Sequence, residues 1–355
     1  MMNRILVFLL SLVICPGFAA LPDGLWKAVY SSTSSEDTLL QYTKMLLRIE
    51  GEAFQLVNYD SYLVEKNFFK NEGLFQSSDS SLVFNSDSIN QKKFKINIID
   101  DSHLVIITRE NPRTEIAFTK MKKYELGGAK DELEESLLIN TFEFNFTFFE
   151  EKFEMEFYGG NRFMVTNNVE PFFPEFSKWA VVEFDSELFI YFSGFSPFLH
   201  VISMDAEGIS CEDEFGEIYK AFFKRIEFQQ KFNREQLLGI WEEKSVNTDY
   251  LKSMPENLWE KDVYPRKVWE INEESATLYS VFRTLDSPME ISRSGEMLKF
   301  LMFNEINNHQ LRILSLDKDN LVVERLDIYG EVCTDTLVKQ KKVPAPVTLK
   351  DFFKE

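Results

Sequence analysis

The stretch Ile99-Asp100-Asp101-Ser102-His103-Leu104 recurs twice along the chain without a gap. The later copies are Met204-Asp205-Ala206-Glu207-Gly208-Ile209 and Leu316-Asp317-Lys318-Asp319-Asn320-Leu321. Each copy has an apolar residue at both ends and Asp in second place, and its fifth residue (His, Gly or Asn) tolerates a positive φ angle. This pattern is typical of a tight hairpin turn in which the Asp side chain binds nearby backbone. The repetition therefore predicts three copies of one β unit.

A second hairpin pattern precedes each of these turns. Two arms rich in β-forming residues flank a polar tip in residues 44–57, 153–166 and 268–281. Between Phe142 and Phe148, phenylalanine alternates with polar residues. A period of two places these phenylalanines on one face of a strand, so we expect them to face a core.

Similar starts and ends delimit the copies. Gly24-Leu25-Trp26 and Gly239-Ile240-Trp241 open the first and third copies, and the three copies close on strands that end at Lys120, Lys224 and Lys339. Many short strands in about a hundred residues leave fewer exposed edges when the sheet closes. We therefore predict an all-β chain of three tandem antiparallel small β-barrels, in residues 21–123, 131–226 and 234–342, with a tail at 343–355.

Helical signal is confined to short stretches near the polar linkers, such as Lys130 to Leu138. Glu135-Ser136-Leu137-Leu138 at one linker parallels Glu235-Gln236-Leu237-Leu238 at the next. We expect both segments to lie just before the first strand of a repeat.

The two Gly-x-Trp segments resemble the signature of lipocalin-like domains, in the small form found in envelope and secreted proteins of bacteria. In that family the tryptophan closes one end of a β-barrel and packs against a basic residue of the last strand. The resemblance implies that Trp26 packs against Lys120 and Trp241 against Lys339. The middle copy departs from the pattern, because Ile139-Asn140-Thr141 stands at the corresponding place.

Residues 1–20 have the form of a secretory signal peptide. Arg4 precedes a short apolar run, Pro16-Gly17 interrupts that run, and small residues end the segment. The alternative is a lipid anchor on Cys15, which the large preceding Ile14 and the following Pro16 disfavour. We expect a secreted or periplasmic protein with no transmembrane segment, since no apolar run reaches the ~20 residues that span a bilayer.

The chain is acidic, with 39 basic and 58 acidic side chains and a net charge of −19. Such a charge repels nucleic acid and anionic membranes. It favours solubility or a basic partner. We expect a monomer without a nucleic-acid partner.

The usual catalytic and metal-binding patterns are missing from the sequence. His103, His200 and His309 are the only histidines, and none accompanies a nucleophile motif. The segment that begins at Asp317 starts like a calcium loop, but it lacks glycine at the sixth position and has Ile328 at the twelfth. We therefore expect no metal, no cofactor and no enzyme activity, although a hydrolase that uses only carboxylates stays a third possibility.

Cys211 and Cys333 are the cysteines that remain after the first 20 residues. They lie in different repeats, so they either form one disulfide that joins two domains or stay as two buried thiols.

The chain has 35 phenylalanines, many of them in the middle copy. Most must be buried in an aromatic core. The functional alternative is an apolar cup lined by Phe192, Phe195 and Phe198, since the mouth of a barrel is where an apolar ligand can bind.

Together these features predict an exported, non-enzymatic binding protein that contacts either a protein partner or an apolar small molecule. The alternative is a structural or assembly factor of the cell envelope or of a secretion system.

Overall fold

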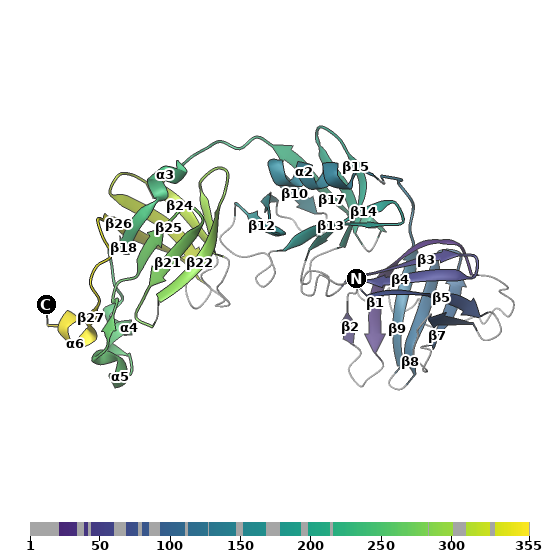
Figure 1. The fold of residues 1–355 in the computed structure, drawn as a ribbon, viewed down its shortest axis with the longest axis horizontal. Coiled ribbons are helices and arrows are strands. Elements are labelled where there is room, and N and C mark those ends of the chain that lie inside the picture. The colour runs from purple at the N-terminus through teal and green to yellow at the C-terminus, as the bar shows by residue number, and fades with distance from the viewer. Residues whose placement is uncertain are drawn as a thin grey trace. The chain divides into compact units, whose positions relative to one another are not determined.

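The computed structural model confirms an all-β architecture with several barrel domains (Figure 1). It describes residues 21–354 except 34–38, 42–43, 60–68, 77–79, 85–92, 111–112, 127, 147–151, 168–177, 193–197, 214–215, 283, 301–309 and 327–330. The predicted signal peptide lies outside the described residues. The described chain forms two compact units, one within Met1–Gly127, Val182–Phe189 and Asp213–Ile218, the other within Gly128–Val181, Ile190–Glu212 and Tyr219–Glu355.

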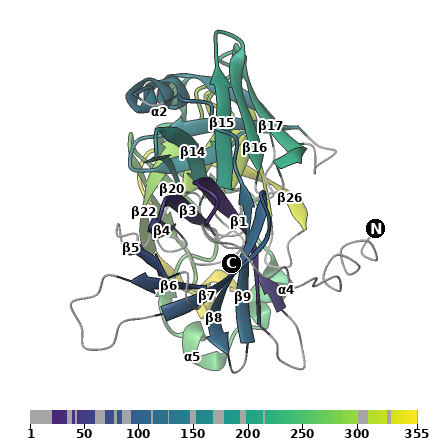
Figure 2. The ribbon, with the colours of Figure 1, turned by 90° about the vertical axis from the view of Figure 1, so that its right-hand side faces the viewer.

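The first repeat is a closed antiparallel barrel whose strands follow one another in sequence order. Strand β1 pairs with β3 on one side and with β9 on the other (Figure 2). The short strand β2 pairs with the end of β1, at residues 31–33. The strands are β1 (Gly24–Thr33), β2 (Leu39–Gln41), β3 (Met45–Glu50), β4 (Ala53–Asn58), β5 (Phe69–Gln76), β6 (Ser81–Phe84), β7 (Lys93–Asp100), β8 (His103–Glu110) and β9 (Arg113–Lys120).

The middle repeat is an eight-stranded sheet with the order β12-β11-β10-β17-β16-β15-β14-β13. Its edge strands meet at one isolated bridge, between Arg162 and Lys178. The predicted helix in front of it is confirmed as α2 (Lys130–Ile139). The strands are β10 (Thr141–Phe146), β11 (Phe153–Tyr158), β12 (Arg162–Val165), β13 (Trp179–Phe184), β14 (Glu187–Phe192), β15 (Phe198–Met204), β16 (Gly208–Asp213) and β17 (Gly216–Ile226).

The third repeat is a second closed barrel, preceded by the short helix α3 (Arg234–Leu237). Its strands are β18 (Gly239–Glu243), β20 (Val268–Ile271), β21 (Ser275–Tyr279), β22 (Thr284–Ile291), β23 (Met297–Phe300), β24 (Gln310–Leu316), β25 (Asn320–Leu326) and β26 (Val332–Gln340).

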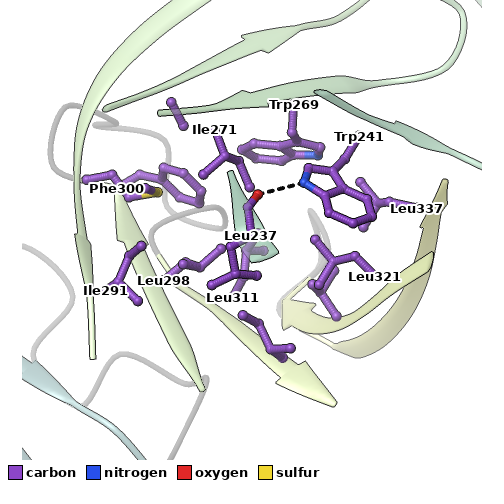
Figure 3. Packing of buried hydrophobic residues seen from close by; sticks show 14 of the residues in the cluster. Leu237, Trp241, Trp269, Ile271, Ile291, Leu298, Phe300, Leu311, Leu321 and Leu337 are labelled. Carbon is purple, nitrogen blue, oxygen red and sulfur yellow. Dashed lines mark hydrogen bonds between the residues drawn. The ribbon is translucent and has the colours of Figure 1, made fainter. Parts of the chain in front are cut away.

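The alternating residues of the third barrel fill its interior with apolar side chains. Figure 3 shows Trp241, Trp269 and Phe300 directed toward aliphatic residues from the other strands. Trp269 stacks on Phe300 with ring centroids 5.0 Å apart. In the middle sheet, Phe142 and Phe144 are buried as the alternation predicts, whereas the side chains of Phe146 and Phe148 lie outside the described residues.

The third repeat also contains an insertion that the sequence pattern did not predict. After β18 the chain forms α4 (Thr248–Lys252), α5 (Glu256–Trp259) and β19 (Asp262–Val263). The C-terminal residues predicted as a tail fold against this insertion, as β27 (Val347–Thr348), which pairs with β19, and α6 (Leu349–Phe352). Leu251, Met254, Val263 and Leu349 form the core between them. Leu349 of the tail is therefore fully buried, and Phe352 and Phe353 are partly buried.

The three repeated turns join equivalent strands: β7 to β8, β15 to β16 and β24 to β25. As predicted, each Asp side chain accepts backbone N–H groups: Asp100 from Ser102, Asp205 from Glu207 and Gly208, and Asp317 from Asp319 and Asn320. These bonds fix the tips of all three hairpins.

The expectation of a positive φ angle at the fifth position of the turn is wrong. His103, Gly208 and Asn320 all lie among the described residues, and none of them has a positive φ angle. Glycine serves a different purpose at 208, because a Cβ atom there would lie 2.1 Å from the carbonyl oxygen of Phe223. Close approach of the neighbouring strand, rather than the backbone angle, therefore requires this glycine.

Equivalent hairpins of the second and third repeats bind the backbone of a linker segment. In the first compact unit, the Glu187 carboxylate accepts the N–H groups of Tyr124 and Glu125. In the second unit, the Ser294 carbonyl oxygen accepts those of Lys231 and Phe232. The two linkers therefore have their backbone donors satisfied by the same type of hairpin.

Among the described residues, the model contains no helix of the length and hydrophobicity needed to cross a membrane.

Candidate functional sites

The predicted barrel-closing pairs are brought together in the structure. Trp26 is directly opposite Lys120 across β1 and β9, and Trp241 is directly opposite Lys339 across β18 and β26. The Lys120 Nζ atom lies 5.6 Å from the Trp26 ring centroid, and the Lys339 Nζ atom lies 4.9 Å from that of Trp241. Both indoles are fully buried. These distances allow a cation–π interaction at one end of each barrel.

The glycine of each Gly-x-Trp segment makes room for the lysine. Gly24 and Gly239 have φ angles of +145° and +129°, which residues other than glycine rarely adopt. A Cβ atom at Gly24 would lie 2.7 Å from Lys120 Cε, and one at Gly239 would lie 3.1 Å from Lys339 Cε. The glycine and the lysine are therefore parts of the same packing arrangement.

The two indole N–H groups have different surroundings. Trp241 Nε1 donates to the Leu237 carbonyl oxygen at 2.8 Å, so α3 supplies its acceptor (Figure 3). Trp26 Nε1 is buried and has no acceptor among the described residues. An unpaired buried N–H group costs free energy, so Trp26 stabilises its barrel less efficiently.

The middle sheet has different residues at the equivalent pair of positions. Phe142 is directly opposite Arg225 across β10 and β17, and the Arg225 N–H binds the Glu207 carbonyl oxygen just as the Lys339 N–H binds that of Asp319. Phe142, not Thr141, therefore stands at the tryptophan position. The expectation that Ile139-Asn140-Thr141 stands in place of Gly-x-Trp is therefore wrong by one residue. The middle repeat has one more residue between Leu138 and this position than the third repeat has between Leu238 and Trp241.

The residues of the predicted apolar cup are only partly described. Phe192 and Phe198 are both buried in the middle sheet, and Phe195 lies outside the described residues. The Phe192 ring centroid is 5.2 Å from that of Phe163 and 6.2 Å from that of Phe157, while Phe198 contacts Tyr191. In the described part of the sheet, Phe192 and Phe198 thus contribute to an aromatic core.

Both cysteines, and two of the three histidines, lie among the described residues. Cys211 and Cys333 are not in a disulfide; Cys211 is buried and Cys333 is half-buried. His200 is buried and its Nδ1 atom lies 3.1 Å from the Glu212 carboxylate, whereas His103 is exposed and bonds to Asp100 in the turn. His309 lies outside the described residues.

Metal-binding geometry does not occur among the described residues, where no group of three or more His, Cys, Asp or Glu side chains converges. Asp317, which resembled the start of a calcium loop, accepts two backbone N–H groups of its own turn. These hydrogen bonds lower the pKa of its carboxyl group.

An acidic cleft lies at the start of the third barrel, where β18 runs beside the turn between β20 and β21. Its volume is about 590 Å³. The residues that line it include three glutamates and are Leu238, Gly239, Ile240, Glu270, Ile271, Asn272, Glu273 and Glu274. Glu273 and Glu274 are exposed to solvent, so their charges are accessible. The sequence marked this segment only as the polar tip of a hairpin.

Hydrogen bonds position the walls of the acidic cleft. Tyr279 Oη donates to Glu270 Oε2 at 2.8 Å, and the pKa of Tyr279 rises to about 12 because of desolvation and the neighbouring carboxylate. Arg234 Nη2 donates to the Glu273 carbonyl oxygen. The Glu270 carboxylate is therefore held by a hydrogen bond, while Glu273 and Glu274 are exposed acidic residues of the same cleft.

No protein-family model matches the chain, and no curated protein matches it. Two solved structures are similar to it at low identity. A protein of unknown function from the DUF3598 family of Nostoc punctiforme is 13% identical, with 90% of this chain and 96% of that chain covered and a TM-score of 0.18. The structure of intact Ap-TbpB, with its N and C lobes, is 8% identical, with coverages of 90% and 78% and a TM-score of 0.18. Neither similarity is close enough to support a conclusion about function, and the lipocalin-like family remains a resemblance.

Proposed function

We propose that this chain is an exported, non-enzymatic binding protein whose acidic cleft binds a basic segment of a protein partner. The observation that supports this most directly is the cleft itself, because its lining includes three glutamates together with the half-buried apolar residues Leu238 and Ile240. A lysine or arginine side chain has the matching form, with an apolar stem and a cationic head.

The filled interior of the third barrel favours a protein partner over an apolar small molecule. Its inward side chains form one continuous buried cluster that includes Trp241, Trp269 and Phe300. A ligand would need to displace these contacts, whereas a partner at the outer cleft would not.

The net charge of −19 adds long-range attraction for a basic partner. Such steering mainly raises the association rate, and it weakens as the salt concentration increases. Export fits this function, since residues 1–20 have the form of a signal peptide.

Photo-crosslinking in the source cells would test the proposal. A photoreactive residue replaces Asn272 at the cleft in the full chain, and the matched control carries it at Asn257 on α5, which does not line the cleft. We expect a discrete protein adduct from position 272 and none from position 257. The adduct should disappear in the Glu273→Lys/Glu274→Lys variant and persist in the Glu256→Lys/Glu260→Lys variant, which has the same net charge.

Equal adducts at both positions, or an adduct that survives the cleft variant, would contradict the proposal. Native mass spectrometry of the purified chain provides a second test. A hydrophobic molecule that copurifies in stoichiometric amount would instead support the alternative of an apolar ligand.

A further inference from the structure

A lysine on the outer face of the third barrel is buried against the middle sheet. Leu298 and Phe300 belong to the barrel core, so the intervening Lys299 on β23 points outward. Lys299 is nevertheless only 7% exposed. Its Nζ atom donates to the Phe163 carbonyl oxygen of β12 at 2.7 Å. The middle sheet therefore covers this lysine.

Within its own barrel, Lys299 faces a carboxylate that the middle sheet occupies. Glu290 is directly opposite Lys299 across β22 and β23, a position in which opposite charges attract. In the structure, however, Glu290 Oε1 lies 2.5 Å from Arg162 Nη2 of β12. We call this contact, which joins Glu290 and Lys299 of the barrel to Arg162 and Phe163 of β12, the joint.

The surroundings of the Lys299 amine in the joint suit its neutral form. A charged ammonium group has three N–H donors, and the described residues provide one acceptor for them, the Phe163 carbonyl oxygen. Removal from water also disfavours the charged form. Burial accordingly lowers the pKa of Lys299 from 10.5 to about 7; Glu290 opposes this change and Arg162 adds to it.

We propose that the joint is a pH-responsive contact, in which docking of the third barrel on the middle sheet releases a proton from Lys299 to the solvent. When the two surfaces separate, water reaches the amine and Glu290 is freed from Arg162, so Lys299 binds the proton again. A contact that releases a proton on forming becomes stronger as the pH rises. The joint therefore tightens above about pH 7 and loosens toward neutral pH.

Glu290 titrates in the opposite sense. Burial raises its pKa from 4.5 and Glu274 adds to this, whereas Arg162, Arg234 and Lys299 lower it. The docked state thus holds the proton of this carboxyl group more tightly, which favours docking as the pH falls. Because a carboxyl group titrates at lower pH than an amine, Lys299 governs the joint above pH 7.

The ionisable groups beside the joint hold the two surfaces together. The Arg293 N–H, at the turn between β22 and β23, donates to Glu156 Oε2 at 2.8 Å, and Tyr158 Oη donates to the same oxygen at 2.5 Å. Burial and the Glu156 carboxylate raise the pKa of Tyr158 well above 10. Tyr158 and the two arginines, Arg162 and Arg293, therefore keep their charge between pH 7 and 9.

A cysteine at position 164 would report the opening of the joint in the full chain. Met164 is buried there in a small apolar core with Met297 and Leu326. Iodoacetamide labels the Met164→Cys chain at pH 6, 7, 8 and 9, and mass spectrometry locates the label. The labelling rate of the same cysteine in urea at the same pH, divided by the native rate, gives its protection.

We expect this protection to rise between pH 7 and 9, by at most about tenfold per pH unit, and to level off below pH 7. Met297→Cys reports on the barrel side of the same core if the Met164→Cys chain does not fold.

Three further substitutions identify the group responsible. Lys299→Met should abolish the rise. Arg162→Gln should move it to higher pH, because Glu290 is then free to pair with Lys299. Arg312→Gln is the matched control, since the Arg312 side chain is 37% exposed against 35% for Arg162 and lies near Glu324 instead. This control should retain the rise.

The native thiol of Cys211, which is buried in the same middle sheet, distinguishes opening of the joint from unfolding of the sheet. Cys211 should be better protected than the cysteine at 164, because opening of the joint leaves the sheet folded. Equal protection of the two thiols would overturn the inference. Protection at 164 that does not change between pH 7 and 9, or a rise that survives Lys299→Met, would also overturn it.

Discussion

Phe142 occupies in the middle sheet the position that Trp241 occupies in the third barrel. Each lies opposite a basic residue on the last strand of its repeat, Arg225 for Phe142 and Lys339 for Trp241. Phe142 is fully buried, and its ring contacts those of Phe157 and Phe223 edge to face. A buried aromatic residue opposite a basic residue is therefore shared by the second and third repeats, and this aromatic residue need not be tryptophan.

Phe142→Ala should lower the free energy of unfolding by about 3–5 kcal/mol, because it leaves a cavity among packed rings. Urea unfolding followed by circular dichroism would measure this loss. Phe228→Ala is the matched control, since Phe228 is 46% exposed, and it should change the free energy by less than about 0.5 kcal/mol. Equal effects of the two substitutions would contradict the assignment of Phe142 as the closing residue.

The two tryptophans should respond differently to the same substitution. Trp241→Phe removes the donor to Leu237 and leaves a carbonyl group unpaired, whereas Trp26→Phe removes an N–H group that has no acceptor among the described residues. We expect Trp241→Phe to cost about 1–2 kcal/mol more. Hydrogen exchange in β18 and β1 would report the local stability of each barrel, and equal losses would show that the Leu237 bond contributes nothing.

Gly239→Ala should destabilise the third barrel by about 1–3 kcal/mol, because its φ angle is +129° and the new Cβ would press on Lys339. Gly159→Ala is the control, since a Cβ atom there would meet no atom within 4 Å. Thermal unfolding of the two variants would distinguish them. A variant at Gly239 that melts like the wild type would argue against close packing of glycine and lysine.

Lys299 should make stability depend on pH above neutrality. Burial lowers its pKa from 10.5 to about 7; Glu290 opposes this shift and Arg162 adds to it. Between about pH 7 and 10.5 the unfolded chain therefore binds more protons at this lysine than the folded chain. The free energy of unfolding should rise with pH across that window, by at most about 1.4 kcal/mol per pH unit from this group.

Below pH 7 the contribution of Lys299 should be constant, because the lysine is then protonated in both states. Urea unfolding at pH 7, 8, 9 and 10 would measure the slope, and the Lys299→Met variant isolates the contribution of this lysine from that of other groups. The difference between the two curves should flatten below pH 7. Parallel curves across the whole range would contradict a lowered pKa.

The repeated hexapeptides contain enough local information to predict the three hairpin turns and the strands beside them. The Asp side chain and the backbone it binds are within three residues of each other, so the sequence specifies them directly. The pairing of Trp26 with Lys120 and of Trp241 with Lys339 could also be predicted, although only through a family resemblance. The shift to Phe142 could not, since a single inserted residue changes which side chain faces the closing residue.

The acidic cleft, and the hydrogen bonds from Lys299 and Gln310 to β12, were not predictable from local patterns. Glu270 and Gly239 come together because β18 pairs with β20, and Lys299 reaches Phe163 only when two separate sheets fold and meet. The folded insertion and tail were missed because their apolar residues are too few and too scattered to show a period.

The sequence by itself determined the β character, the three repeats and their turns, because these depend on side-chain alternation and on hydrogen bonds between near neighbours. Only the tertiary structure decided which residue of the middle sheet lies opposite Arg225, which carbonyl groups of β12 accept from Lys299 and Gln310, and that Glu270 lies beside β18. Those features depend on strand register and on contacts between residues more than a hundred positions apart.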